Sequence, residues 1–381
     1  MRDPNEPLRQ AQERVDALVG DALPGRGRAA PAVLVCALAF AATCWVVGHL
    51  RTLAPPGSRF EADSLARRKY DLYARHAADF DLVFVGTSHV YRQFDAGLFD
   101  EEMAARGYPT RSFNFGLGGM RHPEVRHVAR RVLDRPAGRR PRWLFVELTG
   151  ELVRDRNGWL HDDNPYTHRT IDWHTADVTA LLGRAVLASD APPGVKAEAL
   201  WVHLRHFALR FANVGIAESS IRAWLESVPP PATEEPWNGY QAMDDDPELA
   251  HMRRHFTDRG FRAEHAARIE DLRTRPKAET PDPHLAASLR ALVDAARSAG
   301  VEPVFVIAPP HWHDDVDAYR PDALHGLPAL LSYADPDAFP GLYDVESLYN
   351  DRHLNKLAAR DFTRRLAQDF GELLRERGLL E

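Results

Sequence analysis

Cysteine is almost absent from this chain. Cys36 and Cys44 are the only two among 381 residues, and both lie inside one hydrophobic segment. The rest of the chain therefore has no thiols from which a disulfide framework could form. This composition is compatible with the cytoplasm and with the periplasm, so it does not identify a compartment.

A basic excess is also missing. The formal net charge is −7, and the arginine-rich segments are interleaved with Asp and Glu. Binding to phosphate backbones requires a basic face, so we expect no nucleic-acid partner.

Signals for cofactors and metals are incomplete. The glycines between 116 and 119 are not followed by the Lys-Ser/Thr pair of a phosphate-binding loop. His311 and His313 precede two aspartates but have no third ligand nearby, and residues 161–164 lack the spacing of a calcium loop. We predict no cofactor and no metal, and we place His311 and His313 in a loop that lines the substrate cleft.

What the sequence does contain is an alternation of strand and helix patterns. Apolar residues make up 44% of the chain, which is enough for a sizeable core. Short apolar runs, typical of buried parallel strands, alternate with amphipathic helical segments. The predicted strands are 81–86, 111–115, 143–148 and 304–307, and the predicted helices are 94–106, 123–133, 284–298 and 354–377. This order predicts an α/β domain with a mostly parallel sheet covered on both faces.

The alternation stops between about 149 and 281. Helical patterns at 176–188, 195–214, 219–227 and 262–273 surround a proline-rich loop. We predict a helical insertion that caps the carboxyl edge of the sheet. Its aromatic residues are expected in a small core of its own: Trp201, Phe207, Phe211 and Trp224.

One hydrophobic run stands apart from this domain. Residues 29–48 carry no charge over about 20 residues, the length that crosses roughly 30 Å of hydrocarbon. We predict a transmembrane helix over 29–50, after a short tail (1–28) and before a linker and helix (51–80). A cleaved signal peptide, with a small-residue site at 39–41, and a buried core helix are the alternatives. Arg26 and Arg28 slightly favour a cytoplasmic N-terminus.

A serine follows the first predicted strand. In Gly86-Thr87-Ser88-His89, Ser88 stands where the strand turns into a helix, and reactive groups gather at such carboxyl ends of open sheets. The alternative is a helix N-cap without chemistry.

Four segments in order resemble the SGNH (GDSL-like) hydrolase superfamily, and in particular its membrane-linked bacterial members. The resemblance covers 81 to about 367, apart from the insertion, and implies a three-layer, flavodoxin-like α/β domain extending over 81–381. The segments are Gly86–His89, Asn114–Gly119, Pro141–Gly150 and Tyr349–Asn355.

The resemblance implies a serine mechanism. Ser88 would be the nucleophile and His353 its base, and the N–H groups of Ser88 and Gly119 would bind the oxyanion. Asp351 is the predicted acid.

Two positions depart from the family pattern. The acid usually stands three residues before the histidine, where this chain has Asn350, so Asp344 and Glu346 remain fallback acids. The asparagine that usually completes the oxyanion hole is replaced by Glu151, and Asn114 is the predicted substitute.

These features predict an esterase or O-acyltransferase for acyl esters, with acetyl the expected group, on a cell-envelope glycan. The domain would lie outside the bacterial cytoplasmic membrane, beside envelope polysaccharide machinery, with His89 and Glu151 lining the cleft. One alternative is a catalytically degenerate scaffold within a polysaccharide modification or export assembly. Another is a general lipase or thioesterase.

Overall fold

The computed structural model describes residues 26–50, 64–149, 160, 167–211, 237–256, 259–274, 283–310 and 327–379. The predicted tail before residue 26, the linker at 51–63 and the predicted helix at 219–227 lie outside these residues.

The centre of the molecule is a parallel sheet of five strands in the order β2-β1-β3-β4-β5. This is one of the two common orders of doubly wound sheets, and it confirms the predicted α/β class. The three-residue edge strand β5 was not predicted, because it is partly exposed and lacks a long apolar run. The strands are β1 (Leu82–Gly86), β2 (Ser112–Gly116), β3 (Trp143–Glu147), β4 (Glu302–Ile307) and β5 (Leu330–Ser332).

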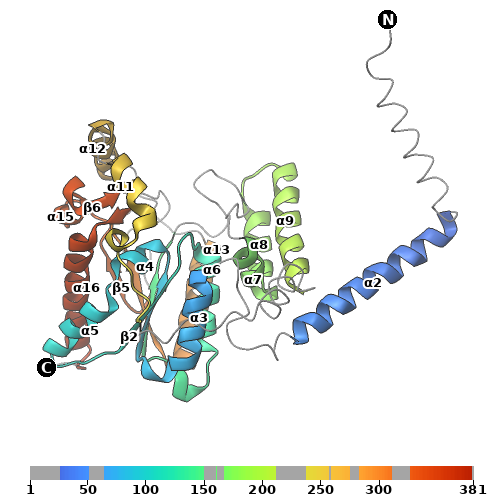
Figure 1. Ribbon diagram of the computed structural model, residues 1–381, viewed down its shortest axis with the longest axis horizontal. Helices are drawn as coiled ribbons and strands as arrows, with labels where there is room; N and C mark the ends of the chain where they lie inside the picture. The colour runs from blue at the N-terminus through green and yellow to red at the C-terminus, as the bar shows by residue number, and fades with distance from the viewer. Residues whose placement is uncertain are drawn as a thin grey trace, which may run out of the picture.

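Helices cover both faces of this sheet (Figure 1). One layer consists of α3 (Ser64–His76), α6 (His122–Leu133) and α13 (Pro283–Ser298). The other consists of α4 (Ser88–Gln93), α5 (Ala96–Ala105) and α16 (Lys356–Glu376). Alternate residues of β1 serve the two layers, with Val83 and Val85 in the first core and Leu82 and Phe84 in the second.

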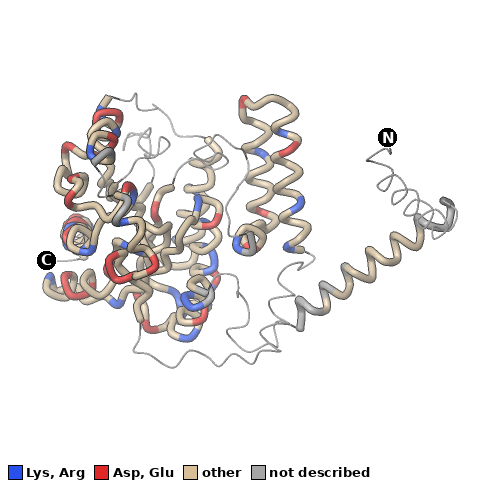
Figure 2. Tube along the Cα trace, turned by 45° about the horizontal axis from the view of Figure 1, so that its top comes forward, with Lys and Arg blue, Asp and Glu red and all other residues tan. Residues whose placement is uncertain are grey.

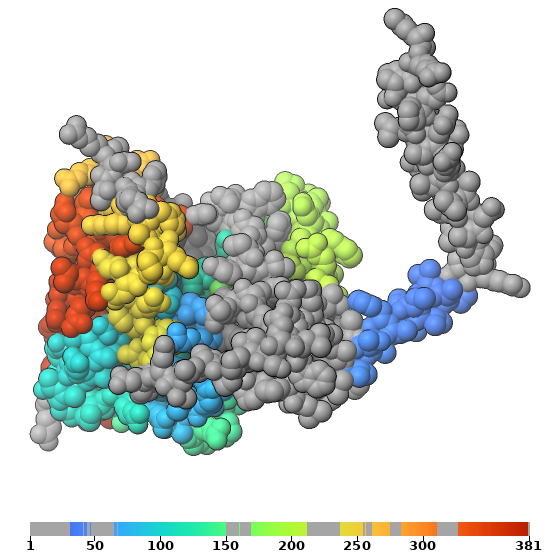
Figure 3. All heavy atoms as spheres, viewed as in Figure 1, coloured from blue at the N-terminus to red at the C-terminus, as the bar shows by residue number. Residues whose placement is uncertain are grey.

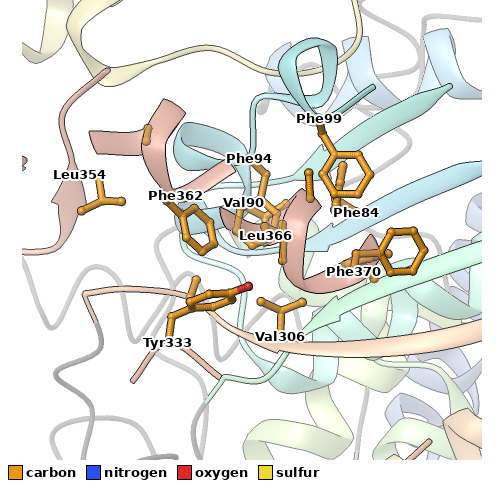
Figure 4. Close-up of a cluster of buried hydrophobic side chains, with 14 of the residues drawn as sticks. Phe84, Val90, Phe94, Phe99, Val306, Tyr333, Leu354, Phe362, Leu366 and Phe370 are labelled. Carbon is orange, nitrogen blue, oxygen red and sulfur yellow. The ribbon is translucent and has the colours of Figure 1, made fainter. Parts of the chain in front are cut away.

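The second core is rich in aromatic contacts (Figure 4). The ring of Phe84 lies 5.4 Å from that of Phe94 and 5.2 Å from that of Phe99, both in edge-on geometry. Phe362 of α16 lies 5.1 Å from Phe94, in the segment after α4. This packing joins the helix that begins at Ser88 to the helix that follows His353.

A two-stranded antiparallel ribbon precedes α16. It consists of β6 (Leu348–Asn350) and β7 (His353–Leu354). Short helical segments complete the described connections: η2 (Ala77–Asp79), η3 (Ala137–Arg139), η4 (Met243–Asp245), η5 (Pro247–Leu249), α15 (Pro340–Tyr343) and η7 (Val345–Ser347).

The helices of the insertion fall into two groups. The helices α7 (Thr167–Trp173), α8 (Ala176–Ala188) and α9 (Pro193–Phe211) share a small core beside α6 and α13. The helices α11 (Ala250–Phe256) and α12 (Arg259–Thr274) contribute instead to the core around α16, and α11 contacts β6 (Figure 1). The described part of the insertion is therefore two helical units rather than one continuous cap.

The prediction that the aromatic residues of α9 form a core is wrong for two of them. Trp201 is 66% exposed and Phe211 is 71% exposed. The helix turns Ala199, His203 and His206 inward, at helical spacing, so Trp201 lies on its opposite face, while Phe211 is exposed at its last residue. This helix occupies the yellow-green surface in Figure 3. Phe207 is partly buried, and Trp224 lies outside the described residues.

The predicted hydrophobic helix forms as α2 (Arg26–Leu50), whose side chains are described at 31–40, 42, 43 and 46. Its large apolar side chains are exposed, among them Val33 (68%) and Phe40 (60%), and Figure 2 shows its described part without charged residues. Within the part of the chain that the structure describes, no helix meets the length and hydropathy needed to span a membrane.

Candidate active site

Ser88 is the first residue of α4, directly after β1. The N-cap of this helix is Thr87, whose hydroxyl accepts from the His89 N–H at 3.1 Å. The hydroxyl of Ser88 is therefore not the capping group that the alternative interpretation required. In this sheet the order reverses at β1, so Ser88 lies at the topological switch point where ligands of doubly wound folds bind.

Two glycines let α4 approach the strand ends closely. A Cβ on Gly86 would collide with the side chains of Glu147 and Val90, and a Cβ on Gly116 would collide with the backbone of Tyr91. These positions accept no side chain without movement of the helix that carries Ser88.

The structure brings Ser88 and His353 together as the sequence predicted. The Nε2 atom of His353 lies 2.8 Å from the Ser88 Oγ, although the two residues are 265 positions apart. This is within the range for general-base catalysis. Ser88 and His353 keep some contact with solvent, although most of each residue is enclosed by protein.

The partner of His353 is Asn350. The Nδ1 atom of His353 lies 3.0 Å from Asn350 Oδ1, which also accepts the backbone N–H groups of Arg352 (2.9 Å) and His353 (3.0 Å). Two backbone donors identify this atom as the amide oxygen, since an amide nitrogen would face them as a third donor. The His353 Nδ1 must then carry the proton, which leaves Nε2 free to accept from Ser88.

The prediction that Asp351 orients His353 is wrong in its geometry. The carboxylate of Asp351 lies 3.3 Å from Arg268 Nη1 and 3.7 Å from Arg352 Nε. The tight turn between β6 and β7 directs the residue three before His353, not two before it, toward the imidazole. Of the fallback acids, Glu346 pairs with Arg262 at the surface.

The environment of His353 disfavours its protonated form. Burial lowers its pKa well below the ordinary value, and electrostatic interactions with His89, Arg92 and Arg352 lower it further. An amide at position 350 fixes the tautomer of the ring but adds no negative charge to offset this effect. The imidazole of His353 is therefore weakly basic and mainly neutral at pH values above its lowered pKa.

The segment Asn114–Gly119 ends in a loop that contains Gly119. The φ of Gly119 is 69°, in the region that favours glycine. The carbonyl of Gly118, in the same peptide unit as the Gly119 N–H, accepts from Arg169 Nη1 at 2.9 Å. Arg169 is held in turn by Glu124 through two bonds of 2.6 and 2.7 Å, and both side chains are 5% exposed. A buried arginine of the insertion thus orients the peptide that the resemblance assigns to the oxyanion hole.

Asn114 does not contribute to that hole. Both amide hydrogens are used inside the protein, with Nδ2 donating to the carbonyls of Val90 (2.6 Å) and Phe94 (2.9 Å). Its oxygen accepts from the Gly116 N–H at 2.9 Å and from Lys69 Nζ at 3.3 Å. Asn114 is fully buried, so it joins β2 to the end of α4 instead of facing substrate.

Replacement of Asn114 by Ala is therefore expected to lower the free energy of unfolding by about 2–4 kcal/mol, because the buried Phe94 carbonyl loses its Nδ2 donor and the Gly116 N–H loses its side-chain acceptor. The Val90 carbonyl loses the same donor but still accepts from the Phe94 N–H at 3.2 Å. Denaturant titration measures this loss. Asn355→Ala, which removes the N-cap of α16, is the control and should cost about 1 kcal/mol. Unchanged stability with lost turnover would return Asn114 to the oxyanion hole.

Two polar residues of the site were not predicted. Glu147, at the end of β3, is 3% exposed and accepts from the Thr87 N–H (2.6 Å) and the Thr87 hydroxyl (3.1 Å). The sequence did hold a signal for Glu147, since it is a charged residue at the end of an otherwise apolar strand. Arg169 gave no signal, because its partners lie 45 and 51 residues away in the sequence.

Three predicted cleft residues lie outside the described residues: Glu151, His311 and His313. The fourth, His89, lies beside the candidate site, with its ring centroid 5.3 Å from that of His353.

Comparison with known proteins gives no match: no family model, curated protein or solved structure is significantly similar to this chain. The inference of function therefore rests on the site itself.

Proposed function

We propose that the protein is a serine-dependent ester hydrolase or O-acyltransferase of the SGNH type. The observation that carries this proposal is the hydrogen-bonded series Ser88 Oγ–His353–Asn350, with the tautomer of His353 fixed by the amide oxygen. A hydroxyl that faces an unprotonated imidazole nitrogen is the arrangement from which serine nucleophiles react.

In the proposed reaction, Ser88 Oγ attacks the acyl carbonyl while His353 Nε2 takes the hydroxyl proton. The N–H groups of Ser88 and Gly119 would stabilise the oxyanion. His353 then passes the proton to the departing alcohol, and the acyl group remains on Ser88 as an ester. Water or an acceptor hydroxyl, deprotonated by His353, releases the acyl group and restores the serine.

We further propose that the acyl group is acetyl and that the substrate is a cell-envelope glycan. Support comes from the sequence, in which the uncharged run at residues 29–48 predicts a single anchor in the bacterial cytoplasmic membrane with the domain outside. Envelope polysaccharide machinery would then be the neighbouring partner.

A second candidate is a non-catalytic scaffold in such an assembly. The observation that favours it is the neutral Asn350 in place of an acid, beside a histidine whose pKa is well below its usual value. Such a site stabilises an imidazolium poorly.

Reaction of the full chain with a fluorophosphonate probe separates these candidates. The enzyme is expected to take up one probe on the peptide that contains Ser88, as read by mass spectrometry. Folded protein that takes up no probe supports the scaffold. Comparison of p-nitrophenyl acetate with longer acyl esters then tests the acyl preference, since faster turnover of long chains would indicate a lipase or thioesterase.

A further inference from the structure

The residue after the nucleophile makes two contacts that the proposed reaction does not use. The Nδ1 atom of His89 lies 3.0 Å from Glu147 Oε1, and its Nε2 atom lies 2.8 Å from the carbonyl oxygen of Arg352. His89 is 9% exposed and Glu147 is 3% exposed, so the pair is buried. Arg352 directly precedes His353 in the chain.

We propose that His89, paired with Glu147, is a positioning residue that holds the base His353 in reach of Ser88. This inference rests on the proposed function and assigns its site a further pair of residues.

Proton counting supports a charged pair. The ring nitrogens of His89 face a carboxylate and a backbone carbonyl, both acceptors, and a neutral imidazole has one N–H. The Thr87 hydroxyl also lies 3.3 Å from Nδ1, but it donates its single proton to Glu147 at 3.1 Å. The imidazolium form satisfies both contacts at once. Glu147 also receives the N–H and hydroxyl donors of Thr87, so its described partners are donors that suit an ionised carboxylate.

The pair connects the three segments that form the site. Glu147 is the last residue of β3 and accepts the N–H of Thr87, the residue before Ser88. His89 follows the nucleophile on α4 and binds the loop between β6 and β7. The Ser88–His353 separation of 2.8 Å is therefore fixed from both sides of Ser88. A displacement of about 1 Å at such a distance can reduce catalysis roughly 100-fold.

The same pair brings a positive charge toward His353. Among the described residues, the other charged groups that lower the pKa of that imidazole are Arg92 of α4 and Arg352 of its own loop. Arg92 pairs with Asp246 at 2.8 Å, and Arg352 lies 3.7 Å from Asp351. Loss of the charge on His89 should therefore raise the pKa of His353. The pH below which activity is lost, the acid limb of the pH–activity profile, would then move upward, since protonated His353 cannot accept the hydroxyl proton of Ser88.

The decisive experiment compares His89→Gln with His127→Gln. His127 is a matched control, because it is also 9% exposed and its Nε2 lies 3.2 Å from a carboxylate, that of Asp172 on α7. For His89→Gln we expect kcat to fall about 10- to 100-fold, KM to change less than about 2-fold and the acid limb to move upward. His127→Gln should resemble the wild type in all three.

Glu147→Gln and Glu147→Asp provide a second comparison. The carboxylate of Asp should restore part of the turnover that Gln loses, whereas a purely steric role would make the two equally poor. Unchanged turnover in His89→Gln, or reduced turnover with an unmoved acid limb, would overturn the proposal.

One readout does not depend on turnover. The ¹⁵N signals of the His353 ring, assigned with His353→Gln, should show an Nδ1–H tautomer in the wild type, in His127→Gln and in His89→Gln, because Asn350 fixes it. The Nε2 signal should show the hydrogen bond from Ser88 in the wild type and in His127→Gln, and its loss in His89→Gln. If the wild type takes up no fluorophosphonate, the proposed function fails, and this spectrum still decides the positioning role. An identical spectrum in His89→Gln refutes that role.

Discussion

Replacement of Ser88 by Ala is expected to lower acyl-ester hydrolysis by about 1,000-fold or more and to abolish fluorophosphonate labelling. The change removes the atom that would form the acyl ester, while His353 and the backbone donors remain. Initial rates with p-nitrophenyl acetate and mass spectrometry of the labelled protein measure the two effects.

The structure indicates that this variant folds. Thr87, not Ser88, caps α4, and alanine is favourable in a helix, so the thermal unfolding midpoint should stay close to that of the wild type. Ser189→Ala, at the end of α8, is the control and should retain full activity. Labelling that persists in Ser88→Ala would place the nucleophile elsewhere.

The second large effect is expected at Asn350. Asn350→Ala should lower kcat by about 100- to 10,000-fold, because the ring of His353 then loses the acceptor that fixes its tautomer. Asp351→Asn should change kcat less than about 2-fold, since the Asp351 carboxylate faces Arg268 and Arg352. Steady-state kinetics of the two variants measures the difference. The reverse order of effects would restore Asp351 as the acid.

Asn350→Asp extends this comparison to pH. A carboxylate there would accept the same three N–H groups and would add a negative charge beside the imidazole. That charge raises the pKa of His353, so the acid limb of kcat/KM should move to higher pH, while activity above the limb should rise because the imidazolium is better stabilised. Wild-type activity, by contrast, should persist below the ordinary histidine pKa. An unmoved limb in Asn350→Asp would contradict this assignment.

Local patterns in the sequence were sufficient to predict the main elements of the domain. Four of the five strands of the parallel sheet were predicted, because apolar runs of strand length end at Gly86, Gly116 or comparable positions. The short strands β6 and β7 were not predicted. The exposed aromatic face of α9 was not, because apolar residues occur on both sides of that helix and periodicity cannot say which side is covered.

Motif order predicted Ser88 and His353 as the candidate nucleophile and base, but it did not identify the residue that contacts His353 Nδ1. Sequence spacing allowed Asp351 or Asn350, and chemistry favoured the acid. The turn between β6 and β7 decides for Asn350, since it brings the Asn350 oxygen within reach of two backbone N–H groups and the imidazole. Asn114 is the opposite case. It lies in a motif that predicted a role in the oxyanion hole, but its amide group donates to buried backbone carbonyls in the core.

The sequence by itself determined the α/β class, the apolar segment at 29–48, and Ser88 and His353 as the candidate reactive pair. Each of these is a local pattern, or an ordered set of local patterns, that can be recognised without distances. Only the tertiary structure shows which groups orient Ser88 and His353 and which groups lie close enough to change the pKa of His353. Asn350, the His89–Glu147 pair and Arg169 act through hydrogen bonds, and those of Glu147 and Arg169 join residues at least 45 positions apart. Such contacts depend on how the strand ends and the insertion pack together, and no local pattern encodes that packing.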